Sequence, residues 1–188
     1  MAIDITEHRD GNAVRRILEA LPEWFGIPEA IDGYAADDSY GSLMALDDGA
    51  PVGVVPTRRH FPESAEIHLM AVHPDVRGTG IGRRLVERVV DDLSADGCTL
   101  LSVHTVGPSF ENAPHAQTRA FYTRMGFLPL EEHENLEWLG PTLILVRALA
   151  TPDQGHAENQ DHTQGTSAPP TNGAGGVGSE MSGNRWGP

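Results

Sequence analysis

The segment Val72-His73-Pro74-Asp75-Val76-Arg77-Gly78-Thr79-Gly80-Ile81-Gly82-Arg83 decides how the fold of this chain is interpreted. A short apolar run precedes it and apolar residues at helical spacing follow it, so it joins a predicted strand over 65–73 to a predicted helix over 80–95. Its three glycines permit the positive φ angles of a tight turn and leave the backbone uncovered. Backbone N–H groups and the dipole at a helix start favour an anion. The segment therefore predicts a loop that binds a phosphorylated cofactor.

The spacing of the glycines, at 78, 80 and 82, separates this loop from two other phosphate-binding loops. It does not fit the Gly-x-Gly-x-x-Gly pattern of dinucleotide-binding proteins, and the chain contains no Lys, which excludes a P-loop. The pattern that is present is Arg-x-x-Gly-x-Gly, and Phe121-Tyr122-Thr123-Arg124-Met125-Gly126-Phe127 follows about 40 residues later. In this order the two motifs resemble the acyl-CoA pyrophosphate loop and the helix-to-strand signature of the GNAT N-acetyltransferase superfamily. The resemblance covers roughly residues 1–149.

The periodicity of apolar residues along the rest of the chain predicts a matching order of elements. Besides the strand and helix above, strands are expected near Ile3 and Ile5, at 41–47, 51–60, 98–106, 127–132 and 137–148, and helices at 10–21, within 22–38 and at 115–125. Asp47-Asp48-Gly49-Ala50 is a strong hairpin signal. The order is that of the GNAT fold. We therefore expect an α/β (α+β) fold with a mixed, mostly antiparallel sheet, splayed in the middle and flanked by helices.

Residues 150–188 differ in composition from residues 1–149. Among 151–188, twelve of 38 residues are Gly or Pro and none is Leu, Ile, Phe or Tyr. Such a segment buries too little apolar surface to offset its ordering entropy. The sequence predicts one acetyltransferase domain over 1–149 and a disordered tail over 150–188, with Trp186 as the one candidate anchor in the tail.

Charge and composition narrow the classes of partner. The formal net charge is −14 and all thirteen basic residues are Arg, so neither nucleic acid nor an acidic membrane is expected as a partner. The first residues lack the basic and apolar parts of a signal peptide, and no apolar run reaches membrane length, which predicts a cytoplasmic location. Cys98 lies in an apolar stretch and is expected in the core. The histidines lack metal-ligand spacing, so no metal is expected.

The resemblance implies a direct transfer of an acetyl group from acetyl-CoA to an amine, with one proton acceptor and one proton donor supplied by the protein. Glu66, in an otherwise apolar strand, stands where some members carry the general base; the alternatives are a surface carboxylate at the edge of the sheet, or a partner for Arg58 or Arg59. His68 shares its face and is a second candidate for the base, and the alternative for His68 is a core histidine with satisfied hydrogen bonds. Tyr122 matches the tyrosine that protonates the leaving thiolate, or else only packs against pantetheine.

The cofactor contacts are expected along one continuous stretch. Backbone groups of Met70, Ala71 and Val72 should run beside the pantetheine arm, and Arg77 should contact the cofactor or brace the loop. The N–H groups of the loop should hold the pyrophosphate; these belong to Gly78, Thr79, Gly80, Ile81, Gly82 and Arg83. Many members of the superfamily carry an Asn at the position of His115, and that Asn contacts the cofactor. This contact is not expected for the present chain.

We therefore predict an N-acetyltransferase for a primary amine, on a small molecule, with Trp24, Phe25 and Tyr34 on the acceptor side. A second hypothesis is acetylation of a protein N-terminus or lysine. A third is a CoA-binding sensor domain without chemistry, against which an intact Glu66 and Tyr122 argue. The sequence leaves open the acceptor amine, the length of the acyl chain and the oligomeric state, including whether the chain forms a homodimer.

Overall fold

The computed structural model describes residues 2–136 and 138–150. The predicted tail, with Trp186, lies outside the described residues. The elements, in chain order, are β1 (Ile3–Glu7), α1 (Gly11–Glu19), α2 (Pro28–Ala36), β2 (Gly41–Asp47), β3 (Ala50–Phe61), β4 (Ser64–Ile67), β5 (Ala71–Val72), the 3-10 turn η1 (Pro74–Val76), α3 (Ile81–Ala95), β6 (Leu100–Val106), α4 (Ala113–Arg124), β7 (Leu128–Glu134) and β8 (Pro141–Ala148). None of the described helices is long and apolar enough to cross a membrane.

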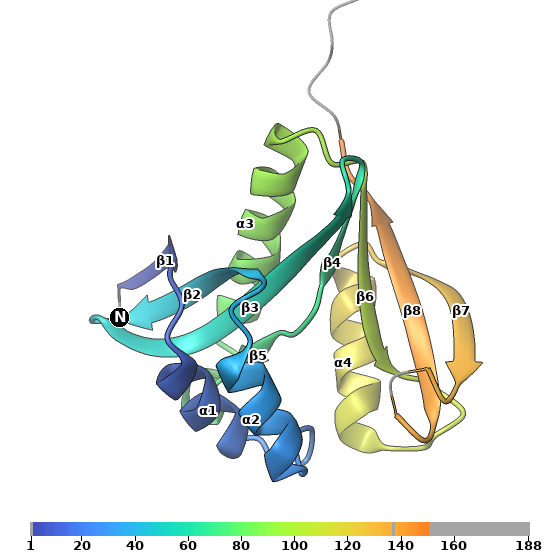
Figure 1. Ribbon diagram of the computed structural model, residues 1–188, viewed down its shortest axis with the longest axis horizontal. Coiled ribbons are helices and arrows are strands. Elements are labelled where there is room, and N and C mark those ends of the chain that lie inside the picture. The colour runs from blue at the N-terminus through green and yellow to red at the C-terminus, as the bar shows by residue number, and fades with distance from the viewer. Residues whose placement is uncertain (1, 137, 151–188) are drawn as a thin grey trace, which may run out of the picture. The chain divides into compact units, whose positions relative to one another are not determined.

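The strands form one mixed sheet that opens in its middle. Their order is β1-β2-β3-β4-β6-β8-β7, with β5 paired to β3. Only β4 and β6 run parallel, and they pair over Ser64–Ile67 and Leu100–Val103; every other pair is antiparallel. Figure 1 shows the path from β4 to β5 separating from β6 below this pairing. The predicted fold class, including the splayed sheet, is confirmed.

The predicted continuous strand over 65–73 is wrong, because β4 and β5 are separated by His68, Leu69 and Met70. These three residues face only two residues of β3, since Thr57 pairs with Ile67 and Val54 with Ala71. The His68 N–H donates to the Pro56 carbonyl oxygen at 3.1 Å. A proline has no N–H to return, so the ladder breaks there and one extra residue bulges out. The bulge frees backbone at the point where the sheet opens.

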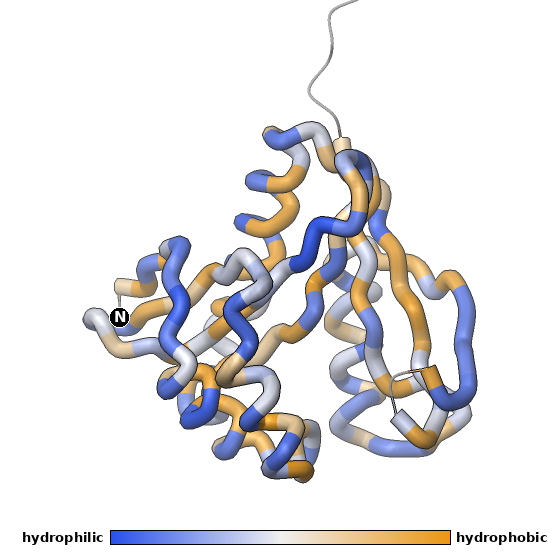
Figure 2. Tube along the Cα trace, in the orientation of Figure 1, coloured by the Kyte–Doolittle hydropathy of each residue, from blue (hydrophilic) through white to orange (hydrophobic). Residues whose placement is uncertain are grey.

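Helices cover both faces of the N-terminal half of the sheet. Along β2 and β3, Met44 and Val54 pack against α1 and α2, while their neighbours Leu43 and Val55 belong to the core on the side of α3. Figure 2 shows hydrophobic residues along β8 and hydrophilic residues along the second half of the edge strand β7. Helix α4 begins two residues earlier than predicted because the Asn112 side chain caps it.

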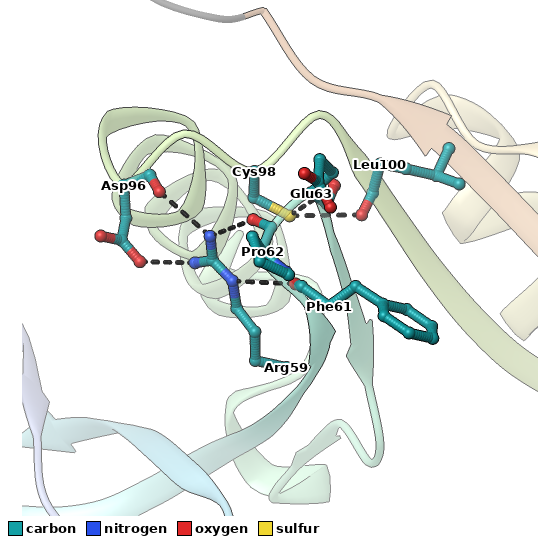
Figure 3. Close-up of polar contacts among 7 residues, drawn as sticks. All are labelled: Arg59, Phe61, Pro62, Glu63, Asp96, Cys98 and Leu100. Atoms are coloured by element: carbon teal, nitrogen blue, oxygen red, sulfur yellow. Dashed lines mark hydrogen bonds and ion pairs between the residues drawn. The ribbon is translucent and has the colours of Figure 1, made fainter.

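The hairpin between β3 and β4 is tied to the end of α3, as Figure 3 shows. The Arg59 guanidinium donates to the Asp96 carboxylate and to the carbonyl oxygens of Phe61, Pro62 and Asp96. Cys98 is fully buried, as predicted, and its thiol lies 3.3 Å from the carbonyl oxygen of Glu63. The Arg59 guanidinium therefore binds these groups and not Glu66, and the alternative that paired Glu66 with Arg59 is wrong.

Candidate active site

A cavity of about 590 Å³ lies where the sheet opens. Its walls come from the α1–α2 segment, from the stretch between β4 and the start of α3, from β6 and from α4. The predicted site residues that line it are Trp24, Phe25, Tyr34, Met70, Ala71, Val72, Arg77, Gly78, Gly80, Ile81, Gly82, Arg83 and Tyr122. Two predicted residues do not line it, Thr79 and Glu66. The Thr79 hydroxyl instead donates to the Val76 carbonyl oxygen at 2.6 Å and closes the loop on itself.

The loop before α3 has the conformation that its glycines permit. Gly78 and Gly80 have φ angles of 76° and 86°, which side chains with a Cβ rarely adopt. Gly80 is the N-cap of α3 and no side chain caps this helix start. The first N–H groups of a helix have no partner within the helix. They therefore remain available to an anionic ligand at the cavity wall.

The charge that lines the cavity is opposite in sign to that of the chain. Arg77, Arg83 and Arg124 line it, and no Asp or Glu is among the described lining residues, although the net charge is −14. Burial lowers the pKa of the Arg77 guanidinium, while the nearby Glu23 carboxylate raises it. A carboxylate-free cavity with three guanidinium groups favours a ligand with several negative charges.

Trp24 connects two walls of the cavity with the loop before α3. Its indole Nε1–H donates to the Thr118 hydroxyl on α4 at 3.1 Å, and the Arg77 guanidinium carbon lies 4.1 Å from its ring centroid. The residue predicted on the acceptor side therefore also contacts the predicted cofactor loop. Phe25 and Tyr34 pack edge to face behind it, with ring centroids 6.1 Å apart.

Tyr122 lies on the α4 side of the cavity with its ring between Phe121 and Phe127. The residue is 3% exposed. Burial raises the pKa of its phenol, so the group keeps its proton at neutral pH. A protonated phenol can donate a proton but cannot serve as a base.

Glu66 is buried behind the cavity wall among three histidines. Its Oε2 lies 2.7 Å from His60 Nε2, and its Oε1 lies 3.7 Å from His68 Nδ1 and 4.0 Å from His104 Nδ1. Burial opposes its ionisation, but the ring N–H groups of His68 and His60 and the charge of His104 outweigh burial and lower the pKa of Glu66 to about 2. The sequence placed these histidines on separate elements, and the register of the sheet brings them together. Within 2–136 and 138–150, no group of three or more His, Cys, Asp or Glu side chains could hold a metal ion.

The lining residues that sequence reasoning did not identify include His104, Thr118 and Thr142. Thr142 is 1% exposed and its hydroxyl has no hydrogen-bond partner, so a ligand in the cavity can supply one. Nothing in the apolar stretch around Thr142 distinguishes it in the sequence. His115 also lines the cavity, and its Nδ1 lies 3.0 Å from the Asn112 side-chain oxygen.

The fold and the loop-lined cavity define the class of acetyl-group transferases to which the two motifs pointed. A model of the acetyltransferase (GNAT) family matches residues 12–127. The chain belongs to this family, and the resemblance drawn from the two motifs is confirmed.

Two curated relatives and two solved structures show where similarity lies. The mycothiol acetyltransferase of Beutenbergia cavernae is 34% identical over 96 residues, which cover 49% of this chain and 30% of that protein. That of Actinosynnema mirum is 35% identical over 132 residues, which cover 63% of this chain and 41% of that protein. The chain thus spans less than half the length of these relatives.

The structures agree in fold. A GNAT-family acetyltransferase from Desulfovibrio desulfuricans has a TM-score of 0.69 at 24% identity and covers 79% of this chain and 100% of its own. A GNAT-family acetyltransferase from Elizabethkingia anophelis, with acetyl-CoA bound, has a TM-score of 0.61 at 20% identity and covers 78% of this chain and 98% of its own.

Proposed function

We propose that the chain transfers an acetyl group from acetyl-CoA to a primary amine on a small molecule. The observation that carries the proposal is the cavity itself, which joins an uncapped helix start, three arginines and the stretch from Met70 to Val72, with no carboxylate among its described lining residues. Acetyl-CoA offers matching groups in the same order, namely phosphates, an amide-containing arm and a thioester. Family membership and the acetyl-CoA-bound neighbour support the same cosubstrate.

The cosubstrate is assigned to the continuous stretch from Met70 to Arg83. The N–H groups of Gly78 to Arg83 hold the pyrophosphate, and the Arg77 and Arg83 side chains add positive charge. The pantetheine amides pair with the backbone of Met70, Ala71 and Val72, along the edge of β5 that lies opposite its pairing with β3. An N–H of this stretch also polarises the thioester carbonyl.

The chemistry is a direct attack of the amine nitrogen on the thioester carbon. The N–C bond forms, the C–S bond breaks and the electron pair leaves with sulfur. Tyr122, held protonated by burial, donates a proton to the thiolate. The centre around Glu66 accepts a proton from the incoming ammonium.

The acceptor is assigned to the wall formed by Trp24, Phe25 and Tyr34. Trp24 also donates to Thr118 on α4, and a site walled by the bulky rings of the α1–α2 segment favours a small molecule over a polypeptide. The curated relatives are named mycothiol acetyltransferases, so the acceptor of those relatives is the first amine to include in a screen.

The experiment combines binding with turnover. Acetyl-CoA should raise Tm, because a ligand that binds only the native state stabilises it. A panel of small amines, N-terminal peptides and lysine peptides is then tested for release of free CoA thiol. Release with a small amine supports the proposal, and release only with peptides supports protein acetylation. Binding without release for any acceptor supports a sensor domain.

We also propose that residues 1–149 form the whole catalytic domain and that the protein acts in the cytoplasm. A chain truncated after Ala150 should keep the Tm and the acetyl-CoA response of the full chain. Light scattering of the full chain distinguishes a monomer from a homodimer.

A further inference from the structure

We propose that His68 is the catalytic base that takes the proton from the acceptor amine, and that Glu66, held by His60, positions and polarises His68 without touching the substrate. The inference rests on the proposed acetyltransferase function and divides the proton-accepting centre into two roles. The division of roles follows from which members of the cluster around Glu66 line the cavity.

Only part of the cluster faces the ligand. His68 and His104 line the cavity, whereas Glu66 and His60 do not. Glu66 is 7% exposed, and its Oε2 is occupied by His60 Nε2 at 2.7 Å. An ammonium group in the cavity therefore meets a histidine ring before it reaches the carboxylate.

The register of the sheet explains why the rings converge on Glu66. Glu66 pairs with Ser102 of the parallel strand β6, so the residues two positions on, His68 and His104, lie on the same face. Both turn Nδ1 toward Glu66 Oε1, at 3.7 Å and 4.0 Å. In His68, the carboxylate beside Nδ1 favours the tautomer with the proton on Nδ1, which leaves Nε2 unprotonated.

His68 is better placed than His104 to act on the acceptor. Its ring stacks on Tyr40, with centroids 4.3 Å apart and an 8° angle between the planes, and lies 5.6 Å from the Tyr34 ring on the proposed acceptor wall. His68 also belongs to the bulge that leads directly into the backbone assigned to pantetheine. The stacked ring is held in place beside the expected position of the thioester.

A histidine also suits the proton transfer energetically. A base works best when its pKa is near the working pH, and the pKa of Glu66 is lowered to about 2. The titratable groups around His68 and its partner Glu66 are His60 from β3, His104 from β6, Tyr34 from α2, and Tyr40 and Asp37 from the segment after α2.

The protons balance in this scheme. Of the three protons of the ammonium, one passes to His68 Nε2 and then to solvent, and one stays on the amide product. The third replaces the proton that Tyr122 gives to the CoA sulfur. No oxidant, metal or further reactant is needed.

The first test measures the tautomer of His68 without any acceptor. Long-range ¹H–¹⁵N spectra of the full ¹⁵N-labelled chain report which ring nitrogen carries the proton, and loss of one signal in His68→Gln assigns it. We expect His68 to carry its proton on Nδ1 in the wild type and to lose this tautomer preference in Glu66→Gln. A wild-type His68 protonated on Nε2, or a tautomer that is unchanged in Glu66→Gln, overturns the inference.

The second test uses the amine that the thiol-release screen identifies. His68→Gln should lower kcat/KM roughly 10²-fold and lose the acidic limb of the pH profile, whereas Glu66→Gln should keep that limb at a lower pH. His133→Gln is a matched control, because His133 also contacts a carboxylate, Glu131 at 3.2 Å, but is exposed on β7.

The outcomes separate this inference from the proposed function. If acetyl-CoA binds and thiol is released but His68→Gln retains the wild-type pH profile, the role of His68 is wrong and the function stands. If acetyl-CoA does not bind to the wild-type chain, the proposed function is wrong, and this base role is wrong with it whatever tautomer the spectra show.

Discussion

The two ends of the cavity are built from different kinds of group. At the end that we assign to the cofactor, the lining residues lie close together in the sequence, between Met70 and Arg83, and the proposed contacts are made by their backbone N–H and carbonyl groups. At the end that we assign to the acceptor, His68, His104 and Thr142 come from three segments far apart in sequence, and the proposed contacts are made by their side chains. The first end depends on local backbone conformation, and the second depends on how the strands are aligned.

This difference determines how each end should respond to mutation. A loop that needs positive φ angles tolerates no side chain at its glycines, so a single change should remove binding altogether. A set of side chains loses one group at a time, so conservative changes should reduce the rate in steps while binding of acetyl-CoA persists.

The largest effect is expected for Gly80→Val at the cofactor end. Gly80 has a φ of 86°, and a β-branched residue there strains the backbone and covers the start of α3. At about 100 times its Kd, acetyl-CoA should stabilise the wild-type chain by roughly 2.7 kcal/mol. Thermal denaturation should show no such stabilisation in the variant.

Gly49→Val is the matched control for that experiment. Gly49 has a φ of 84° in the turn between β2 and β3, and open space surrounds the position of its missing Cβ, as at Gly80. Both variants should lose stability through similar strain, but Gly49→Val should keep the full response to acetyl-CoA. A response retained in Gly80→Val would refute the assignment of the loop.

The loop before α3 could be predicted from the sequence because its determinants are contiguous. Glycine spacing, the preceding apolar run and the helical period of α3 are all local, so they are visible without knowledge of strand pairing. The break between β4 and β5 was missed, although Pro56 in the middle of β3 carries a signal for it. That signal has meaning only once His68 is known to lie opposite Pro56.

The acceptor end could not be predicted to the same extent. The convergence of His60, His68 and His104 on Glu66 depends on the registers of β3, β4 and β6. In the sequence, β4 and β6 are separated by the whole of α3. Apolar periodicity does not fix the register of their parallel pairing to within one residue. From sequence, Arg58 and Arg59 were equally reasonable partners for Glu66.

The second-largest effect is expected for Tyr122→Phe. The ring packing against Phe121 and Phe127 survives, and only the hydroxyl is lost. Because the phenol acts only when the C–S bond breaks, kcat should fall roughly 10²-fold while the KM for acetyl-CoA changes little. Steady-state kinetics with the identified amine measure both. A rise in KM at constant kcat would mean that Tyr122 only packs against pantetheine.

A smaller effect, which should disappear in acid, is expected for Glu66→Gln. The folded-state pKa of Glu66 is about 2 against a reference of 4.5, so its ionised form stabilises the protein fully above about pH 4.5, and this stabilisation is lost as the pH falls toward 2. Urea unfolding should therefore find the variant less stable at pH 6, with the deficit shrinking through this window.

Glu63→Gln serves as the control, since Glu63 is exposed in the β3–β4 turn. Its stability difference from the wild type should not vary between pH 6 and pH 3. A deficit of Glu66→Gln that is constant with pH would show that the histidines do not stabilise the carboxylate.

The smallest effect is expected where the two sides of the cavity meet, at the bond between Trp24 Nε1 and the Thr118 hydroxyl. Trp24→Phe removes the donor but keeps a ring under Arg77, and Thr118→Val removes the acceptor with little change in shape. Each should cost about 0.5–1.5 kcal/mol of the free energy of unfolding, the usual net value of one hydrogen bond. The double variant should cost less than the sum, because the second change removes a bond already lost. Additive costs in urea unfolding would show that the hydrogen bond between Trp24 and Thr118 contributes nothing to stability. The contact with Arg77 would then be the one that holds Trp24 in place.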